Sequence, residues 1–232
     1  MIIARAPYRI SFFGGGTDYP AWYREHPGAV LATSIDKHCY IFARWLPPFF
    51  EHKHRIVWSQ TELTRTIAEI QHPTVRACLG WMGFTEGIEI YHAADLPARA
   101  GMGTSSAFTV ALLRALCALE NEALSKMELA SRAIHVEQTI IKENVGSQDQ
   151  VMAAYGGFNR IDFGGHEVVP DIRVTSISLA PERLEELQSH LMLVYSGISR
   201  TASHLAGELI EDIPLRTKEL NQMYGIVDEG VK

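Results

Sequence analysis

A glycine-rich segment followed at once by an apolar stretch contains the residue types that could bind a phosphate group. Gly101 and Gly103 precede the hydroxyl side chains of Thr104, Ser105 and Ser106, and the apolar run after them predicts a buried helix. Glycine lets backbone amides approach a ligand closely, because no Cβ stands in the way. The first turn of a helix has unpaired N–H groups and carries roughly half a positive charge. These residues therefore predict an anion site, most plausibly for phosphate.

A turn and a helix cap could use the same residues. Thr104 or Ser105 could be an N-cap, and the two glycines could shape an ordinary turn, so the residues alone leave both interpretations open. A Walker A loop is excluded, because the segment has no Gly-Lys-Ser/Thr sequence. A dinucleotide fingerprint is weakly matched, because a loop containing Pro97 separates the predicted strand 87–91 from the first glycine.

A carboxylate within an apolar helical stripe is the second candidate for chemistry. The pattern predicts a helix over 126–143, in which Glu137 lies one turn after Ala133 and one turn before Ile141. A carboxylate that faces a core is costly unless it is paired or binds a cation. A salt bridge to an arginine is the structural alternative. Because phosphate chemistry nearly always requires magnesium, a metal ligand is the functional interpretation.

Two further polar segments stand out. Residues 14–18, Gly-Gly-Gly-Thr-Asp, give a sharp turn signal after a predicted strand at 2–13. Residues 146–150, Gly-Ser-Gln-Asp-Gln, form a polar loop, in which Asp149 either caps the next helix or acts on a substrate.

The composition argues against several classes of protein. A formal charge of −6 and a pI near 5.9 do not favour nucleic acid as the main partner, since binding to its phosphates needs a basic face. No apolar run reaches the roughly 18 residues of a membrane span, and the N-terminus lacks the plan of a signal peptide. Three widely separated cysteines predict neither a disulfide framework nor a zinc site. We therefore expect a cytoplasmic protein.

The hydropathy pattern predicts a chain of mixed strands and helices. Strands are expected at 2–13, 51–59, 87–91, 159–163, 174–179 and 191–195, with a hairpin formed by 30–35 and 39–43. Helices are expected at 62–80 with a break at Pro73, and at 105–119, 126–143, 181–188 and 201–210. A boundary between two domains is expected near residues 180 and 181.

Three separated segments together resemble the GHMP kinases, small-molecule kinases that include galactokinase, homoserine kinase and mevalonate kinase. Residues 97–107 are similar to the family signature Pro-x-x-x-Gly-Leu-Gly-Ser-Ser-Ala, residues 5–18 to its first motif, and residues 146–150 to its Gly-x-x-Asp-Gln motif. The Gly-Gly-Gly-Thr-Asp form looks most like the kinases that act on D-glycero-D-manno-heptose 7-phosphate, with fucokinase-type enzymes as near cousins. Each motif is moderately specific, and their order and separation make the combination strong.

The resemblance implies an α+β fold of two domains. Residues 1–180 would form the N-terminal ATP-binding domain with a left-handed β-α-β unit, and residues 181–232 would begin a ferredoxin-like C-terminal domain. The family's third, glycine-rich signature is missing, so we expect a chain truncated in that domain, and its own activity is left open. The alternatives are a non-catalytic remnant that binds nucleotide and a homodimer that completes the sheet with a neighbour.

The resemblance also implies magnesium-dependent transfer of a phosphoryl group from ATP to the anomeric hydroxyl of a sugar or sugar phosphate. Asp149 would be the catalytic aspartate, kept ionised by Arg9, and Ser105 with Glu137 would hold Mg²⁺. The nucleotide phosphates would lie against Gly101, Gly103, Thr104, Ser105 and Ser106. The sugar hydroxyls would lie against Gly15, Gly16, Thr17 and Asp18. The candidates to bind a substrate phosphate are Arg5, Arg99 and Arg200. The motifs do not exclude a kinase for another sugar, such as fucose or galactose.

Overall fold

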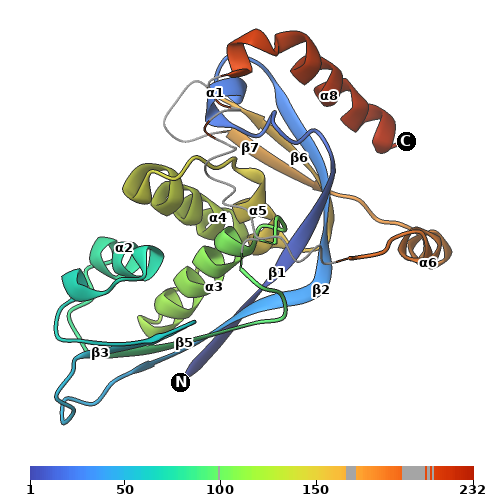
Figure 1. Cartoon of the computed structure of the whole chain (residues 1–232). Coiled ribbons are helices and arrows are strands. Elements are labelled where there is room, and N and C mark those ends of the chain that lie inside the picture. Colours follow the sequence, from blue (N-terminus) through green and yellow to red (C-terminus); the bar gives the residue numbers. More distant parts are fainter. Residues whose placement is uncertain (99, 166–170, 195–206, 208–209, 211) are drawn as a thin grey trace.

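The computed structural model describes residues 1–98, 100–165, 171–194, 207, 210 and 212–232. These residues form a mixed α+β structure around one sheet, whose strand order is β4-β3-β5-β2-β6-β7, with β1 paired to β2 outside this path (Figure 1). The strands are β1 (Ile2–Phe13), β2 (Gly28–Trp45), β3 (His54–Val57), β4 (Thr61–Thr64), β5 (Ile88–Ala94), β6 (Phe158–Gly164) and β7 (Asp171–Ser176). All pairings are antiparallel except that of β3 with β5, whose connection contains β4 and a helix; the left-handedness expected of a β-α-β unit stays a prediction.

Strand β2 is the longest element of the sheet and corrects the predicted hairpin. Residues 28–45 form one continuous strand of 18 residues. Its middle residues, Asp36 and Lys37, are followed by no glycine, proline or asparagine that would favour a tight turn. Strand β1 pairs with β2 from Ile2 opposite Ala43 to Phe13 opposite Leu31, with a register shift between Pro7 and Arg9, so it is paired with both halves of β2 and continues past residues 35–37.

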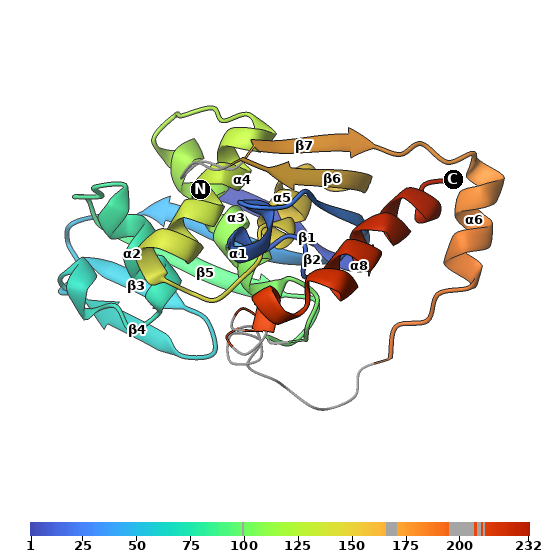
Figure 2. The ribbon, with the colours of Figure 1, turned by 90° about the horizontal axis from the view of Figure 1, so that it is seen from above.

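Helices cover one face of the sheet, and a last helix lies on the other face (Figures 1 and 2). The first layer contains α2 (Pro73–Trp81), α3 (Thr104–Leu119), α4 (Lys126–Ile134) and α5 (Gln148–Tyr155). Val30 of β2 belongs to the core under this layer. The next residue, Leu31, points the other way and packs with Val227 of α8 (Thr217–Gly230). Successive side chains of β2 therefore pack alternately against the helical layer and against α8.

The predicted helix 62–80 is wrong in its first half. Residues 61–64 are strand β4, antiparallel to β3, and Glu62 and Thr64 form its buried side. A 3₁₀ turn at Ile67–Glu69 follows, and α2 begins only at Pro73, a residue that is favourable in the first turn of a helix. The two-residue alternation of β4 was therefore a strand signal within a segment that was assigned to a helix.

The remaining elements agree in part with the sequence predictions. The predicted helix 126–143 is present as α4, continued by a π-helical segment at His135–Ile141. Helix α6 (Pro181–Ser189) was predicted and buries none of its residues. Residues 191–194 of the predicted strand 191–195 are not in a strand. Residue 195 and most of the predicted helix 201–210 lie outside the described residues. A short helix α1 (Pro20–Tyr23) follows the first glycine turn.

Across the described ranges, none of the helices combines the length and the apolar character needed to cross a membrane. The apolar residues are concentrated under the helical layer, where α3 alone buries residues from Ser106 to Cys117. Ile213 and Leu220 belong to the same buried cluster, so the last part of the chain packs against the sheet. The sheet and α3 therefore form the support on which the candidate site is built.

Candidate active site

An ion pair joins two of the three motif segments. Arg9 of β1 donates from Nε to Asp149 Oδ1 at 2.6 Å and from Nη2 to Asp149 Oδ2 at 2.9 Å. The two side chains are 15% and 24% exposed, so the pair lies at the surface of the site and is not sealed in the core. Two parallel bonds of this kind fix the orientation of the carboxylate as well as its position. Asp149 belongs to the first turn of α5, which faces Arg9.

Arg9 also donates hydrogen bonds to the glycine loop. Arg9 Nη1 donates to the carbonyl oxygen of Gly101 at 3.0 Å, and the Arg9 backbone N–H donates to the carbonyl oxygen of Met102 at 3.2 Å. Gly103 has φ of +69°, and a Cβ there would lie 3.3 Å from the Asp149 carboxyl. The backbone conformation and the close approach of Asp149 therefore both favour glycine at this position.

The helix start that was predicted to bind phosphate is present in the structure. Helix α3 begins at Thr104, directly after Gly103, and the Ala107 N–H donates back to the Gly103 carbonyl oxygen. Ser105 is exposed and Ser106 is buried. An N-terminal helix turn with exposed hydroxyl and backbone groups, beside an arginine and an aspartate, is suited to receive a phosphate.

Glu137 is buried, as its place in the apolar stripe predicted. Its exposed fraction is 1%, and Oε2 accepts hydrogen bonds from Ser106 Oγ at 2.8 Å and from Gln150 Nε2 at 2.5 Å. Oε1 has no hydrogen-bond partner among the described residues. Burial raises the pKa of Glu137 to about 7, although the side chains of Thr109, Gln150 and Ser106 lower it by favouring the charged carboxylate. No arginine pairs with it in the described hydrogen bonds and ion pairs, so the structural alternative of a salt bridge finds no support there.

The environment of Glu137 Oε1 can be compared with the ligands that Mg²⁺ prefers. Mg²⁺ in kinases takes one or two protein carboxylates and completes its coordination with waters and substrate phosphates. Within the described ranges, no three or more His, Cys, Asp or Glu side chains cluster as a metal site. One buried carboxylate oxygen without a partner, beside a phosphate-type helix start, fits an ion held jointly with a nucleotide. Ser106 makes the hydroxyl contact to Glu137, whereas the sharing of a cation by Ser105 and Glu137 stays a prediction.

The first glycine turn is folded against the loop that carries Asp149. Asp18 is 1% exposed and accepts hydrogen bonds from the N–H of Gly16 at 3.1 Å and of Gln148 at 3.3 Å. The Ser147 N–H donates to the Asp18 carbonyl oxygen at 2.9 Å. A Cβ at Gly146 would lie 2.0 Å from Asp18 Oδ2, so the two loops meet without space for a side chain. Burial, with the nearby Asp149 charge, raises the pKa of Asp18 to about 6.

The buried Thr17 side chain forms hydrogen bonds within this turn and to strand β2. Its hydroxyl donates to the Gly14 carbonyl oxygen at 2.8 Å and accepts from the Ala29 N–H at 3.0 Å. The Thr17 hydroxyl and the Asp18 carboxylate were predicted to bind sugar hydroxyls, and in the structure they form hydrogen bonds that hold the loop together. Their contact with a sugar, like that of Gly15 and Gly16, stays a prediction.

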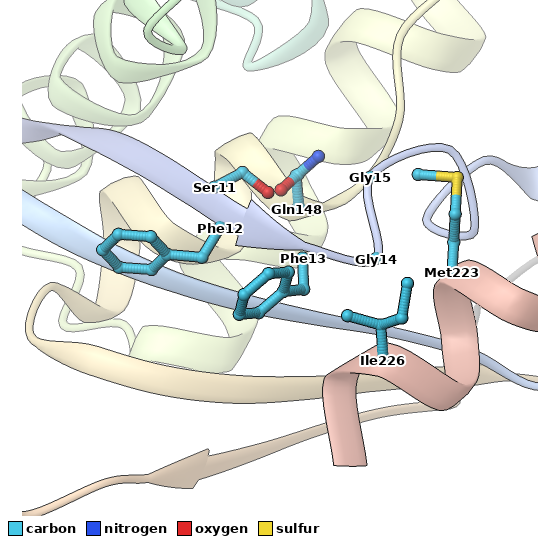
Figure 3. Close-up of a pocket in the computed structure, with 8 residues that line it drawn as sticks. All are labelled: Ser11, Phe12, Phe13, Gly14, Gly15, Gln148, Met223 and Ile226. Atoms are coloured by element: carbon cyan, nitrogen blue, oxygen red, sulfur yellow. The ribbon is translucent and has the colours of Figure 1, made fainter. Parts of the chain in front are cut away.

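A pocket of about 330 Å³ adjoins this turn (Figure 3). It lies between the end of β1 and α8, and its lining residues are Ser11, Phe12, Phe13, Gly14, Gly15, Gln148, Met223 and Ile226. The sequence predictions included only Gly15 of this set. Gln148 and Gln150, on either side of Asp149, were missed as well, although their place within a polar motif was the available signal. Of the arginine candidates for a substrate phosphate, Arg5 is exposed on β1, and Arg99 and Arg200 lie outside the described residues.

The family profile described as GHMP kinases N terminal domain matches residues 62–157. A D-glycero-alpha-D-manno-heptose 7-phosphate kinase of Campylobacter jejuni is 24% identical over 100% of this chain and 70% of that protein. A galactokinase of Chloroflexus aurantiacus is 26% identical over 77% of this chain and 45% of that protein.

The solved structures extend the similarity to the fold. The crystal structure of a D-glycero-D-manno-heptose 1-phosphate kinase from Bacteroides thetaiotaomicron superimposes with a TM-score of 0.70 at 22% identity, covering 82% of this chain. This chain in turn covers 64% of that structure's length. The fold is that of the GHMP kinases, and residues 62–157 match the N-terminal domain model of that family.

Proposed function

We propose that this chain transfers the γ-phosphoryl group of ATP to the anomeric hydroxyl of a sugar or sugar phosphate, with D-glycero-D-manno-heptose 7-phosphate as the preferred acceptor. The observation that carries the proposal is the convergence of the Arg9–Asp149 pair with the glycine loop before α3. A candidate phosphate site and a candidate base thus lie side by side. The identity of the acceptor is supported by the Campylobacter relative and by the Gly-Gly-Gly-Thr-Asp turn.

In this mechanism the chain mainly positions groups and stabilises charge, as is usual for phosphoryl transfer. The backbone amides at the start of α3 would bind the phosphates of ATP, and Arg9 would hold Asp149 in one orientation. Asp149 would accept the proton of the sugar hydroxyl as that oxygen bonds to the γ-phosphorus and the bond from phosphorus to ADP breaks. Magnesium, held by Ser105 and Glu137, would offset the charge that develops on the phosphates.

A kinase assay tests the proposal directly. The chain is incubated with radiolabelled ATP, magnesium and one acceptor at a time: D-glycero-D-manno-heptose 7-phosphate, L-fucose or D-galactose. We expect labelled product with the heptose phosphate, formed faster than with either hexose. Faster labelling of fucose or galactose would replace the proposed acceptor.

Calorimetry with a non-hydrolysable ATP analogue separates the remaining outcomes. Binding of the analogue without product from any acceptor would favour a non-catalytic nucleotide-binding protein. Absence of both binding and product would overturn the kinase proposal for this chain, since neither of its two substrates would then be recognised.

A further inference from the structure

The helical segment that carries Glu137 also contacts the loop that precedes Asp149. Helix α4 continues at His135–Ile141 as a π-helical segment, a geometry that is rare in proteins and frequent at functional sites. Within it, Glu137 is buried beside the start of α3. The next residue, Gln138, is partly buried and directs its amide toward residues 145–147. Two adjacent residues of one segment therefore contact the surroundings of the candidate metal site and of the candidate base.

Gln138 holds this loop through the NH₂ group of its side chain. Nε2 donates to the Val145 carbonyl oxygen at 3.1 Å, to Ser147 Oγ at 3.1 Å and to the Gly146 carbonyl oxygen at 3.4 Å. An amide NH₂ group has two protons, so the two shorter contacts account for both of them. One side chain thus binds three successive residues of the loop.

Ser147 connects this contact to the start of α5. It is fully buried, and its Oγ accepts from Gln138 Nε2 and lies 3.1 Å from the Tyr23 hydroxyl oxygen. Its backbone N–H donates to the Asp18 carbonyl oxygen at 2.9 Å. Ser147 is the N-cap residue of α5, and Asp149 lies in the first turn of that helix. The place where α5 begins, and with it the place of Asp149, therefore depends on these contacts.

The surroundings of Asp149 leave little tolerance for a shift of α5. Arg9 holds the carboxylate by two hydrogen bonds, and the carboxyl group lies 3.3 Å from the position of a Cβ at Gly103. These contacts orient the side chain, whereas the backbone of α5 must bring it to this place. A displacement of about 1 Å can lower the rate of a reaction about a hundredfold. A residue that fixes the start of α5 therefore acts on turnover without touching a substrate.

We propose that Gln138 is a positioning residue that holds residues 145–147 so that Asp149 faces the start of α3. The inference rests on the proposed function, because it gives Gln138 a part in the reaction in which Asp149 is the base. Gln138 lies outside the three motifs at 5–18, 97–107 and 146–150 that named the other candidates.

Two variants remove the donor in different ways. Gln138→Met keeps the length of the side chain without the amide, and Gln138→Glu keeps its shape but turns the donor into an acceptor. With the acceptor that the native chain phosphorylates fastest, we expect each variant to lower kcat at least about tenfold. The KM for ATP and the magnesium concentration for half-maximal activity should stay within about twofold, because α3 and Glu137 keep their own contacts. Thr139→Ala is the matched control, since Thr139 is exposed on the same segment.

Amide hydrogen exchange, followed by mass spectrometry, tests the loop without requiring turnover. In the native chain the Ser147 and Gln148 N–H groups both donate to Asp18. Loss of the hydrogen bond from Gln138 should make a peptide of residues 143–149 exchange about fivefold faster. Exchange in residues 106–116 of α3 should be unchanged. The melting temperature and the affinity for an ATP analogue report whether each variant is folded.

The outcomes separate this inference from the proposed function. Native kcat in both variants, or native exchange in residues 143–149, would overturn the positioning role, and labelled product from the native chain would still support the kinase proposal. Parallel losses in kcat, in ATP binding and in the protection of α3 would mean that Gln138 only stabilises the fold, which also overturns the inference. If the native chain forms no product, the proposed function fails, and exchange in residues 143–149 alone decides whether Gln138 holds the loop.

Discussion

The three carboxylates of the site lie in different environments. Asp18 and Glu137 are each 1% exposed, whereas the Asp149 side chain is 24% exposed and is oriented by Arg9. A general base must reach the proton that it accepts, so Asp149 is the carboxylate best placed to meet a substrate. The two buried carboxylates have raised pKa values, because burial disfavours their charged forms.

Replacement of the candidate base should affect turnover more than binding. We expect Asp149→Ala to lower kcat about a hundredfold, the effect of losing a general base. The affinity for an ATP analogue should change little, because the amides at the start of α3 remain. Asp162→Ala is the matched control, since it removes another arginine-paired carboxylate, on β6. A kcat within a few-fold of the native value in Asp149→Ala would exclude Asp149 as the base.

Glu137→Gln tests the metal site. Glutamine can still accept the hydrogen bonds from Ser106 and Gln150, so the fold should be retained. The charge that attracts a cation is lost, and the magnesium concentration for half-maximal activity should rise at least about tenfold, the effect typical of losing even an outer partner of a metal site. Titration of activity with magnesium measures this. An unchanged titration curve would mean that Glu137 does not bind the ion.

Asp18 should make the stability of the protein depend on pH. Its pKa is raised to about 6 in the folded chain, whereas an unfolded chain has about 3.9. The stabilising contribution is therefore present below about pH 4 and is lost as the pH rises through 6, with a total near 3 kcal/mol. We expect the native chain to gain more unfolding free energy than Asp18→Asn when the pH falls from 7.5 to 5. Urea unfolding at both pH values measures the difference, and parallel changes in both chains would contradict the assignment.

Local sequence patterns predicted some elements better than others. The helix that begins at Thr104 was predicted from the local order of glycine, hydroxyl and apolar residues, and the burial of Glu137 from its place in an apolar helical stripe. Continuous strand β2 was missed because its outcome depends on pairing with β1, which is distant in sequence. Strand β4 was missed because four residues carry little periodicity and the helical signal of α2 follows closely.

Two valine-to-alanine variants test whether helix α8 packs against the sheet. Val227 is fully buried against Ala29 and Leu31, on the sheet face opposite α3. Val227→Ala should reduce the free energy of unfolding by about 2 kcal/mol, because it removes buried methyl groups and leaves a cavity. Val231→Ala, at the exposed end of the same helix, should change it by less than about 0.5 kcal/mol. Equal effects in urea unfolding would mean that α8 does not pack on the sheet in solution.

The two layers of the molecule meet at the candidate site. The helical layer supplies α3, α5 and Glu137 to the candidate phosphate site, and α8 on the opposite face supplies a wall of the pocket beside the first glycine turn (Figures 1 and 3). The sequence motifs named Arg9, Asp149 and the residues at the start of α3, which the structure brings together, whereas their binding of phosphate stays a prediction. They did not predict Gln148, Ser11 or Met223 as pocket residues, because that pocket is formed only when α8 packs beside the end of β1. Contacts between distant segments of this kind leave no local pattern.

Binding of nucleotide should stabilise the whole molecule, because the proposed phosphate site joins β1, α3 and α5 through Arg9 and Asp149. A ligand present at a hundred times its dissociation constant stabilises a folded chain by about 2.7 kcal/mol. For a protein of this size that corresponds to a rise in melting temperature of about 5 to 10 °C. We expect this rise with ATP and magnesium, and a smaller one when EDTA removes the metal, since Glu137 then repels the phosphates. Adenosine without phosphates is the control for binding of the base alone. A melting temperature that ATP leaves unchanged with and without magnesium would contradict a nucleotide site, whereas equal rises with ATP and adenosine would place the binding energy away from the start of α3.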